Sequence, residues 1–137
     1  MKIFFSALVF LLAAPMVFSQ AYVKDYSNSR KVWEYNDGYL KDYSNSKKLL
    51  ELDGEYIKEY SSSKKLYQFD GTYLKEYSSS KKILQFDGEY IKDYSSSRKL
   101  YEIDGKYIND YSNSRKLYEV NGIIPIHLIM AAILHYK

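Results

Sequence analysis

YIKEYSSSKKLYQFDGT is the sequence of residues 56–72, and close copies of this stretch fill most of the chain. The tyrosine at its first position recurs at residues 22, 39, 56, 73, 90 and 107 without an insertion. Self-similarity at a fixed period of 17 residues predicts a repeat architecture built from six units. Positions within a unit are numbered here from 1, which is Tyr56, to 17, which is Thr72.

Each unit predicts a β-hairpin. Two runs of strand-forming residues, 56–60 and 65–69, flank a serine turn at residues 61–63. Asp70-Gly71 follows the second run, and an Asp-Gly pair between apolar residues predicts a two-residue type I′ turn, with positive φ at both central positions. In the first unit the glycine shifts to give Asn36-Asp37-Gly38, which predicts a longer turn with a bulge.

The two turns together predict a strand register. A two-residue Asp-Gly loop pairs Phe69 with Thr72, and a three-residue serine loop pairs Tyr67 with Ile57. Both loops then match position 10 with position 4 and position 12 with position 2. Each position therefore faces the same partner position on both neighbouring strands. The register predicts an opposite-charge pair between lysine at position 10 and the carboxylate at position 4. It gathers positions 2, 12 and 14 on a dry face and the tyrosines of positions 1 and 5 on the other.

The segment 123–137 predicts an apolar helix. Pro125 suits the first turn, and the following ten residues contain no helix breaker. The stretch is apolar on nearly every side and too short to span a bilayer, which needs about 20 residues. Twelve strands close into a ring of radius about 12 Å, whose lumen is about as wide as one helix. The fold class we predict is therefore all-β, a closed meander with the helix packed in or on its axis.

Two forms of closure stay open at this point. If each position faces the same partner position on both sides, the strand register is not staggered around the ring. A true barrel requires such a stagger, which is called shear. A radial, flower-like set of hairpins with the helix on its axis or base is therefore the alternative to a barrel.

Residues 1–19 predict a signal peptide. Met1-Lys2 is followed by a predominantly apolar run over residues 3–18, and we place the cleavage site after Ser19. A retained N-terminal anchor is the alternative. The remaining chain divides into the repeat domain, residues 20–122, and the C-terminal helical segment. The prediction for location is export, to the periplasm or outside the cell, and the absence of cysteine means that disulfides do not stabilise the fold.

Short units with serine-rich and Asp-Gly turns, a signal peptide and an apolar terminal helix containing Ala131-Ala132 resemble the bacterial beta-flower repeat proteins. The resemblance covers residues 22–134, although the inner turn here is Ser-Ser-Ser where a glycine is expected. It implies a fold and no assigned activity. More distantly, the tyrosine and glycine spacing is similar to MORN-type and WG-type hairpin repeats, which act as interaction scaffolds.

Residue types that carry catalysis or bind metals form no convincing constellation. His127 and His135 are eight residues apart, about 80° around a helix, which suits a shared metal poorly. The serines at positions 6 and 8 are interpreted as turn formers, since a serine nucleophile needs a neighbouring base. The aspartates at position 15 are interpreted as turn residues rather than calcium ligands. We predict no catalytic residue, no metal and no cofactor.

The predicted binding surface consists of two rows of tyrosines. Their rings offer stacking area to glycans, peptides or cell-wall polymers. Plain coverage of an amphipathic sheet is the alternative. The residues are Tyr22, Tyr39, Tyr56, Tyr73, Tyr90 and Tyr107 at position 1, and Tyr26, Tyr43, Tyr60, Tyr77, Tyr94 and Tyr111 at position 5.

The functional prediction is a non-enzymatic structural or interaction scaffold of the bacterial envelope. A glycan or cell-wall polymer binding module is the first alternative and a hydrolase the second. The formal net charge is only +3, and acidic and basic residues alternate in each unit, which disfavours nucleic acid as a partner. The partner is otherwise open, an envelope glycan or a protein, and no stable membrane span is expected in the mature chain.

Overall fold

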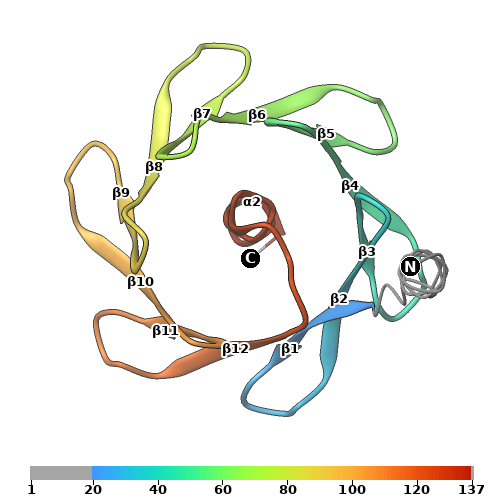
Figure 1. The fold of residues 1–137 in the computed structure, drawn as a ribbon, viewed down its shortest axis with the longest axis vertical. Coiled ribbons are helices and arrows are strands. Elements are labelled where there is room, and N and C mark those ends of the chain that lie inside the picture. The colour runs from blue at the N-terminus through green and yellow to red at the C-terminus, as the bar shows by residue number, and fades with distance from the viewer. Residues whose placement is uncertain (1–19, 137) are drawn as a thin grey trace, which may run out of the picture.

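The computed structural model describes residues 20–136. The predicted signal peptide, residues 1–19, lies outside the described residues. Twelve antiparallel strands, two from each unit, form a closed barrel around one helix (Figure 1). The elements are β1 (Ala21–Asp25), β2 (Lys31–Asn36), β3 (Tyr39–Asp42), β4 (Lys48–Asp53), β5 (Tyr56–Glu59), β6 (Lys65–Phe69), β7 (Tyr73–Glu76), β8 (Lys82–Phe86), β9 (Tyr90–Asp93), β10 (Lys99–Asp104), β11 (Tyr107–Asp110), β12 (Lys116–Asn121) and α2 (Ile126–Tyr136).

The barrel confirms the predicted all-β meander and decides between its two forms of closure. Every strand pairs with its sequence neighbours, and β1 pairs with β12 to close the ring, with Val23 opposite Val120. The six serine loops flare outward from the wall in Figure 1. The molecule is therefore a closed barrel with flared loops and not a set of separate radial hairpins.

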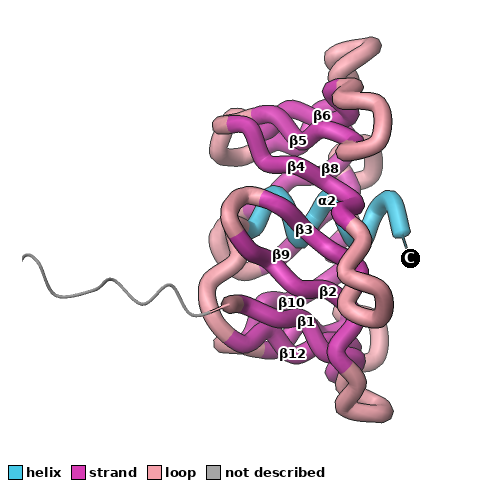
Figure 2. The backbone as a smooth tube through the Cα atoms, turned by 90° about the vertical axis from the view of Figure 1, so that its right-hand side faces the viewer, coloured by secondary structure: helices cyan, strands magenta, loops and turns pink. Residues whose placement is uncertain are grey.

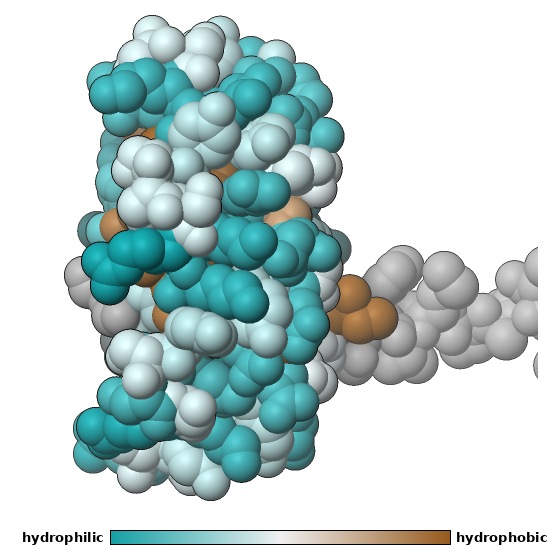
Figure 3. Space-filling model, turned by 90° about the vertical axis from the view of Figure 1, so that its left-hand side faces the viewer, coloured by the Kyte–Doolittle hydropathy of each residue, from teal (hydrophilic) through white to brown (hydrophobic). Residues whose placement is uncertain are grey.

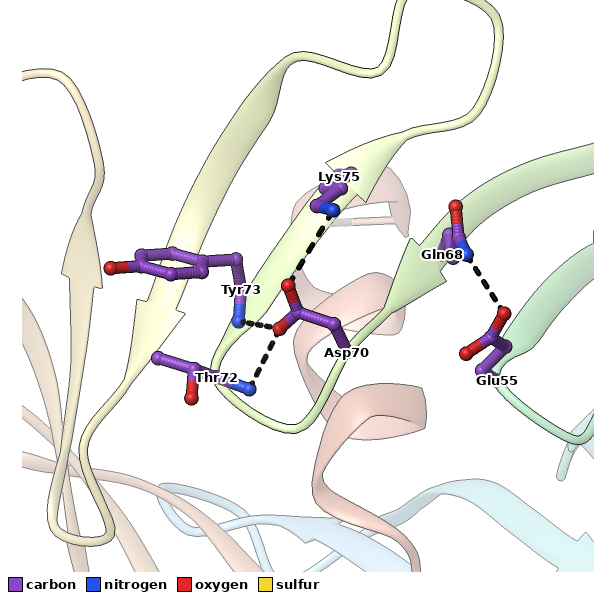
Figure 4. Close-up of polar contacts among 6 residues, drawn as sticks. All are labelled: Glu55, Gln68, Asp70, Thr72, Tyr73 and Lys75. Atoms are coloured by element: carbon purple, nitrogen blue, oxygen red, sulfur yellow. Dashed lines mark hydrogen bonds and ion pairs between the residues drawn. The ribbon is translucent and has the colours of Figure 1, made fainter.

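The junction between units differs from the predicted two-residue Asp-Gly loop. Phe69 pairs with Leu74 and not with Thr72, so the loop is Gly71-Thr72 and the predicted register is wrong by two residues. The feature that the turns share is a positive φ at the first loop residue, which is Asp37 in the first turn and Gly54, Gly71, Gly88 and Gly105 in the others. At Gly71 the φ is 101°, and the side chain of Asp70 also accepts hydrogen bonds from the backbone N–H groups of Thr72 and Tyr73, at 3.0 and 2.8 Å (Figure 4).

The junction of the first unit was predicted to be longer, and this prediction is also wrong. Asn36 pairs with Tyr39 without any shift of register, so the loop is the two residues Asp37 and Gly38. Both have positive φ, 53° and 85°, which is the pattern of the type I′ turn. Asn36 occupies the place that aspartate holds in later units, and the loop length is unchanged.

The revised register supplies the shear that a barrel requires. Tyr67 pairs with Ile57 on one side, as predicted, but with Glu76 on the other, so the pairing advances by two residues in each unit. The same displacement recurs at all six junctions and adds up to twelve residues around the ring. Twelve strands with this shear tilt by about 35° and form a barrel of radius about 11 Å.

A β-bulge in each hairpin corrects the second half of the predicted register. Lys65 pairs with Lys58 and not with Glu59, because the register shifts between Ile57 and Lys58. The extra residue is accommodated by a four-residue loop, 60–63, closed by a hydrogen bond from the Glu59 N–H to the Lys64 carbonyl at 2.8 Å. The bulge turns the lysine of position 10 onto the outer wall, and in the described residues the register places position 10 opposite position 3 in place of the predicted position 4.

The interior confirms the predicted dry face and the buried helix. The six side chains of position 2 are 0–1 % exposed, and Leu128, Met130, Ala131 and Ala132 of α2 are fully buried among them. In Figure 1 the helix lies inside the ring of strands, and in Figure 2 it runs through the barrel from end to end. The Pro125 carbonyl accepts the first hydrogen bonds of the helix, from Leu128 and Ile129. The apolar part of the helix, residues 128–133, is thus enclosed by apolar strand residues, whereas residues 134–136 are exposed.

Candidate functional site

The tyrosines predicted as a binding surface lie on the outer wall and meet in pairs across the units. Each position 1 tyrosine contacts the position 5 tyrosine of the next unit edge to face, with ring centroids 5.4–5.8 Å apart and interplanar angles of 77–88°. The pair Tyr107 and Tyr26 joins the last unit to the first. Closure of the barrel therefore completes a ring of six equivalent pairs.

A lysine completes each pair. The ammonium of Lys65 lies 4.0 Å from the centroid of the Tyr56 ring and 5.3 Å from that of Tyr77. The same contacts, at 4.0–4.6 Å to position 1 and 5.2–5.6 Å to position 5, are made by Lys31, Lys48, Lys82, Lys99 and Lys116. These distances are typical of cation–π interactions, each worth about 0.5–1 kcal/mol at an exposed site. We call the six groups the Tyr-Lys-Tyr clusters.

The sequence prediction missed these lysines because it placed position 10 at the rim of the dry face. One signal was present: position 10 is lysine in all six units, whereas its neighbour at position 9 is either lysine or arginine. A residue type that never varies among otherwise degenerate units indicates a specific contact. Only the bulge, which the predicted turn lengths did not include, reveals on which face that contact lies.

The position 5 tyrosines are the accessible part of each cluster. Their side chains are 42–47 % exposed, whereas the position 1 rings are half-buried and have one face covered by lysine. Figure 3 shows an outer wall that is mostly hydrophilic to neutral, with hydrophobic colour confined to small spots. Each cluster therefore presents an aromatic edge and an oriented cation to an outside partner.

Asp70 and Asp87 of position 15 act as turn residues, in agreement with the interpretation of the sequence. Besides its two backbone contacts, Asp70 forms an ion pair with Lys75 at 3.5 Å (Figure 4), and Asp87 forms one with Lys92 at 3.1 Å. Hydrogen bonds from the N–H groups of Tyr90 and Glu89, followed by Lys92, lower the pKa of Asp87 to about 2. Within residues 20–136 no group of three or more histidine, cysteine, aspartate or glutamate side chains could hold a metal ion.

The loop serines are bonded to the carboxylates of position 4. The hydroxyl of Ser27 donates to Asp25 at 2.6 Å, and that of Ser62 donates to Glu59 at 2.8 Å. Position 8 has φ of 59–61° in every unit, a left-handed conformation that tightens the end of the loop. A hydroxyl that donates to a carboxylate in an exposed loop shapes the turn and is not the arrangement of an activated nucleophile beside an oxyanion hole.

The two histidines lie at opposite ends of α2. His127 stacks on Phe69 with ring centroids 5.0 Å apart and an interplanar angle of 7°, and burial lowers its pKa. Its Nε2 atom is buried without a hydrogen-bond partner within the described part of the chain. His135 is exposed and contacts the rings of Tyr67 and Tyr136 edge to face. The structure therefore does not bring the histidines together.

Comparison with known proteins gives no relative for this chain: no family model matches it, and no curated protein and no solved structure matches it significantly. The resemblance to beta-flower repeats stays a prediction. In the segment from residue 20 to residue 136, no helix is both long enough and apolar enough to cross a membrane.

Proposed function

We propose that this protein is an exported, non-enzymatic interaction scaffold of the bacterial envelope that binds its partner through the six Tyr-Lys-Tyr clusters. The observation that supports the proposal is the sixfold repetition of one outward-facing arrangement around a closed wall. Repeated sites on a rigid body favour multivalent attachment, in which weak contacts add up to tight binding. The resemblance to beta-flower and other hairpin repeats agrees with such a role.

A non-enzymatic role follows from the same repetition. Catalysis usually needs one asymmetric constellation of a nucleophile, a base and an oxyanion hole. Here the loop carboxylates hold the serines in turns, and both histidines belong to α2. We therefore rank a hydrolase last.

Binding of a glycan or cell-wall polymer along the tyrosine rows is the second candidate. The exposed position 5 rings favour it, because aromatic side chains provide stacking area at low entropic cost. We rank glycan binding below a scaffold role, because Lys65, 4.0 Å from the centroid of the Tyr56 ring, occupies a face on which a sugar would stack.

Photocrosslinking in cells tests the scaffold directly. A photoreactive phenylalanine replaces Tyr60, Tyr77 or Tyr94, one at a time, and the control places it at Ser79 in an exposed loop. Because the clusters are equivalent, we expect adducts of the same mass at the three tyrosine positions and none at the control. The proposal is wrong if the clusters yield no adduct or if only the loop does.

Two further measurements separate the remaining parts of the proposal. Cosedimentation with purified cell-wall polysaccharide, saturable in the wild type and lost on Tyr→Ala at position 5 of several units, would favour the glycan-binding module over the scaffold. Cell fractionation with N-terminal sequencing tests export: the mature protein is expected in the envelope or medium and to begin at Gln20. A cytosolic protein that retains Met1 would contradict it.

A further inference from the structure

Between neighbouring serine loops the barrel end carries grooves, and one of them departs from the sixfold pattern. The groove between units 3 and 4 measures about 210 Å³ and that between units 4 and 5 about 360 Å³. The two linings share five unit positions, among them lysines at positions 9 and 10 and the carboxylate at position 4 of the next unit. The groove between units 1 and 2 measures about 520 Å³, within the usual range of about 300–1,000 Å³ for small-molecule sites.

The larger groove has an aromatic lining that comes from three separate parts of the chain. Trp33 of β2, the only tryptophan, stacks on Tyr118 of β12 with ring centroids 5.8 Å apart and an interplanar angle of 30°. Tyr136, at the end of α2, adds a third ring that is 38 % exposed. Units 1 and 6 meet only because the barrel closes, so the groove lies at the seam of the ring.

Polar groups surround these rings with balanced charge. Arg30 and Lys31 are opposed by Asp25 and Asp42, so the formal charges of the lining side chains cancel. In both aspartates the hydrogen bonds from the following serine reach Oδ1, at 2.9 Å from the N–H and 2.6 Å from the hydroxyl. Oδ2 of each carboxylate is left to accept hydrogen bonds from a ligand.

We infer that the groove between units 1 and 2 is a binding site for a neutral saccharide. Trp33 is only 6 % exposed, so the accessible aromatic surface comes from Tyr118 and Tyr136. Such rings beside carboxylate acceptors suit a pyranose, whose C–H face packs on a ring while its hydroxyl groups donate to oxygen acceptors. A charged ligand gains little, because the lining has no net charge. The inference goes beyond the scaffold role, since the site is asymmetric and uses Trp33 and Tyr136, which have no counterpart in the other units.

Trp33 allows the inference to be tested by fluorescence, since no other tryptophan contributes to the signal. The probes are the neutral tetrasaccharides of glucose and of N-acetylglucosamine, with the tetramer of galacturonic acid as the anionic comparison. We expect a saturable change in Trp33 fluorescence with at least one neutral probe and binding about tenfold weaker for the anionic one. The inference is overturned if neither neutral probe gives a saturable change at concentrations up to about 10 mM.

Two variants with a matched control locate the binding. Tyr136→Ala and Asp42→Asn remove an aromatic wall and an acceptor, and each should weaken binding about tenfold or more. Asp93→Asn makes the same change in the groove between units 4 and 5, which lacks the aromatic lining, and should leave the affinity unchanged. Equal losses in Asp42→Asn and Asp93→Asn would overturn the inference. Because Tyr60, Tyr77 and Tyr94 do not line this groove, the crosslinking result can fail or succeed independently.

Discussion

Replacement of Leu128 by alanine tests whether the helix is held by the barrel. Leu128 is fully buried in the first turn of α2, in one core cluster with Leu40, Leu50 and Ile57 of the wall. The change removes three carbon atoms, worth about 0.8 kcal/mol each when buried, or about 2.4 kcal/mol in total. The cavity left behind adds to this, because the surrounding side chains relax only in part. We expect the free energy of unfolding to fall by about 3 kcal/mol.

Leu134→Ala provides the matched control for this experiment. Leu134 lies on the same helix but is 40 % exposed, so the same deletion should cost less than about 1 kcal/mol. Both variants share the small gain in helix propensity from leucine to alanine, which therefore cancels in the comparison. Urea titrations followed by circular dichroism and Trp33 fluorescence give both values. If the two variants differ by less than about 0.5 kcal/mol, the helix does not contribute a buried face and the reasoning fails.

Three more predictions concern the wall, the turn and the buried histidine. Lys65→Met should lower stability by about 0.5–1 kcal/mol through loss of its contacts with Tyr56 and Tyr77, whereas Lys64→Met, in the exposed loop beside it, should have almost no effect in thermal denaturation. Gly71→Ala should lower the free energy of unfolding, measured by urea titration, by about 1 kcal/mol or more, because φ at this residue is 101°. No atom lies within 4 Å of the added methyl group, so the loss would come from the backbone conformation alone. An unchanged urea midpoint would contradict this turn conformation. The lowered pKa of His127 means that the unfolded chain binds more protons than the folded one below pH 6.5, so stability should fall from pH 8 to pH 5. His127→Phe, which keeps the stack on Phe69, should reduce that fall, and an identical fall in both proteins would show that His127 is not its source.

Much of the fold follows from the repeat itself. Alternation within the unit identifies position 2 as core, and the apolar terminal segment requires an enclosure, so the barrel with its central helix could be predicted. The register could not, because it depends on which residue begins the turn at each junction and on a bulge at position 11, neither of which apolar patterning reports. The error at the junction removed the shear and left closure undecided, and the missed bulge placed the lysine of position 10 on the wrong face.

The same errors hid part of the candidate site. The tyrosines were identified by their recurrence, and the structure places all twelve in cross-unit pairs on the outer wall. Their lysine partners depend on the bulge, so they were assigned to the wrong face. The groove between units 1 and 2 was missed for a different reason: Trp33, Tyr118 and Tyr136 are far apart in sequence, and only closure of the ring brings the first and last units together.

Closure between β1 and β12 also constrains how this gene can change its repeat number. Open arrays lengthen or shorten by one unit at little cost, because each unit contacts only its neighbours. In this ring, one hairpin more or fewer alters the radius by about 2 Å, roughly half the thickness of a side-chain layer. A ring of seven units would be too wide to pack against the helix. A ring of five units would be too narrow to contain it. Duplication or deletion of one unit is therefore expected to destabilise the fold, because the width of the ring is matched to a single helix.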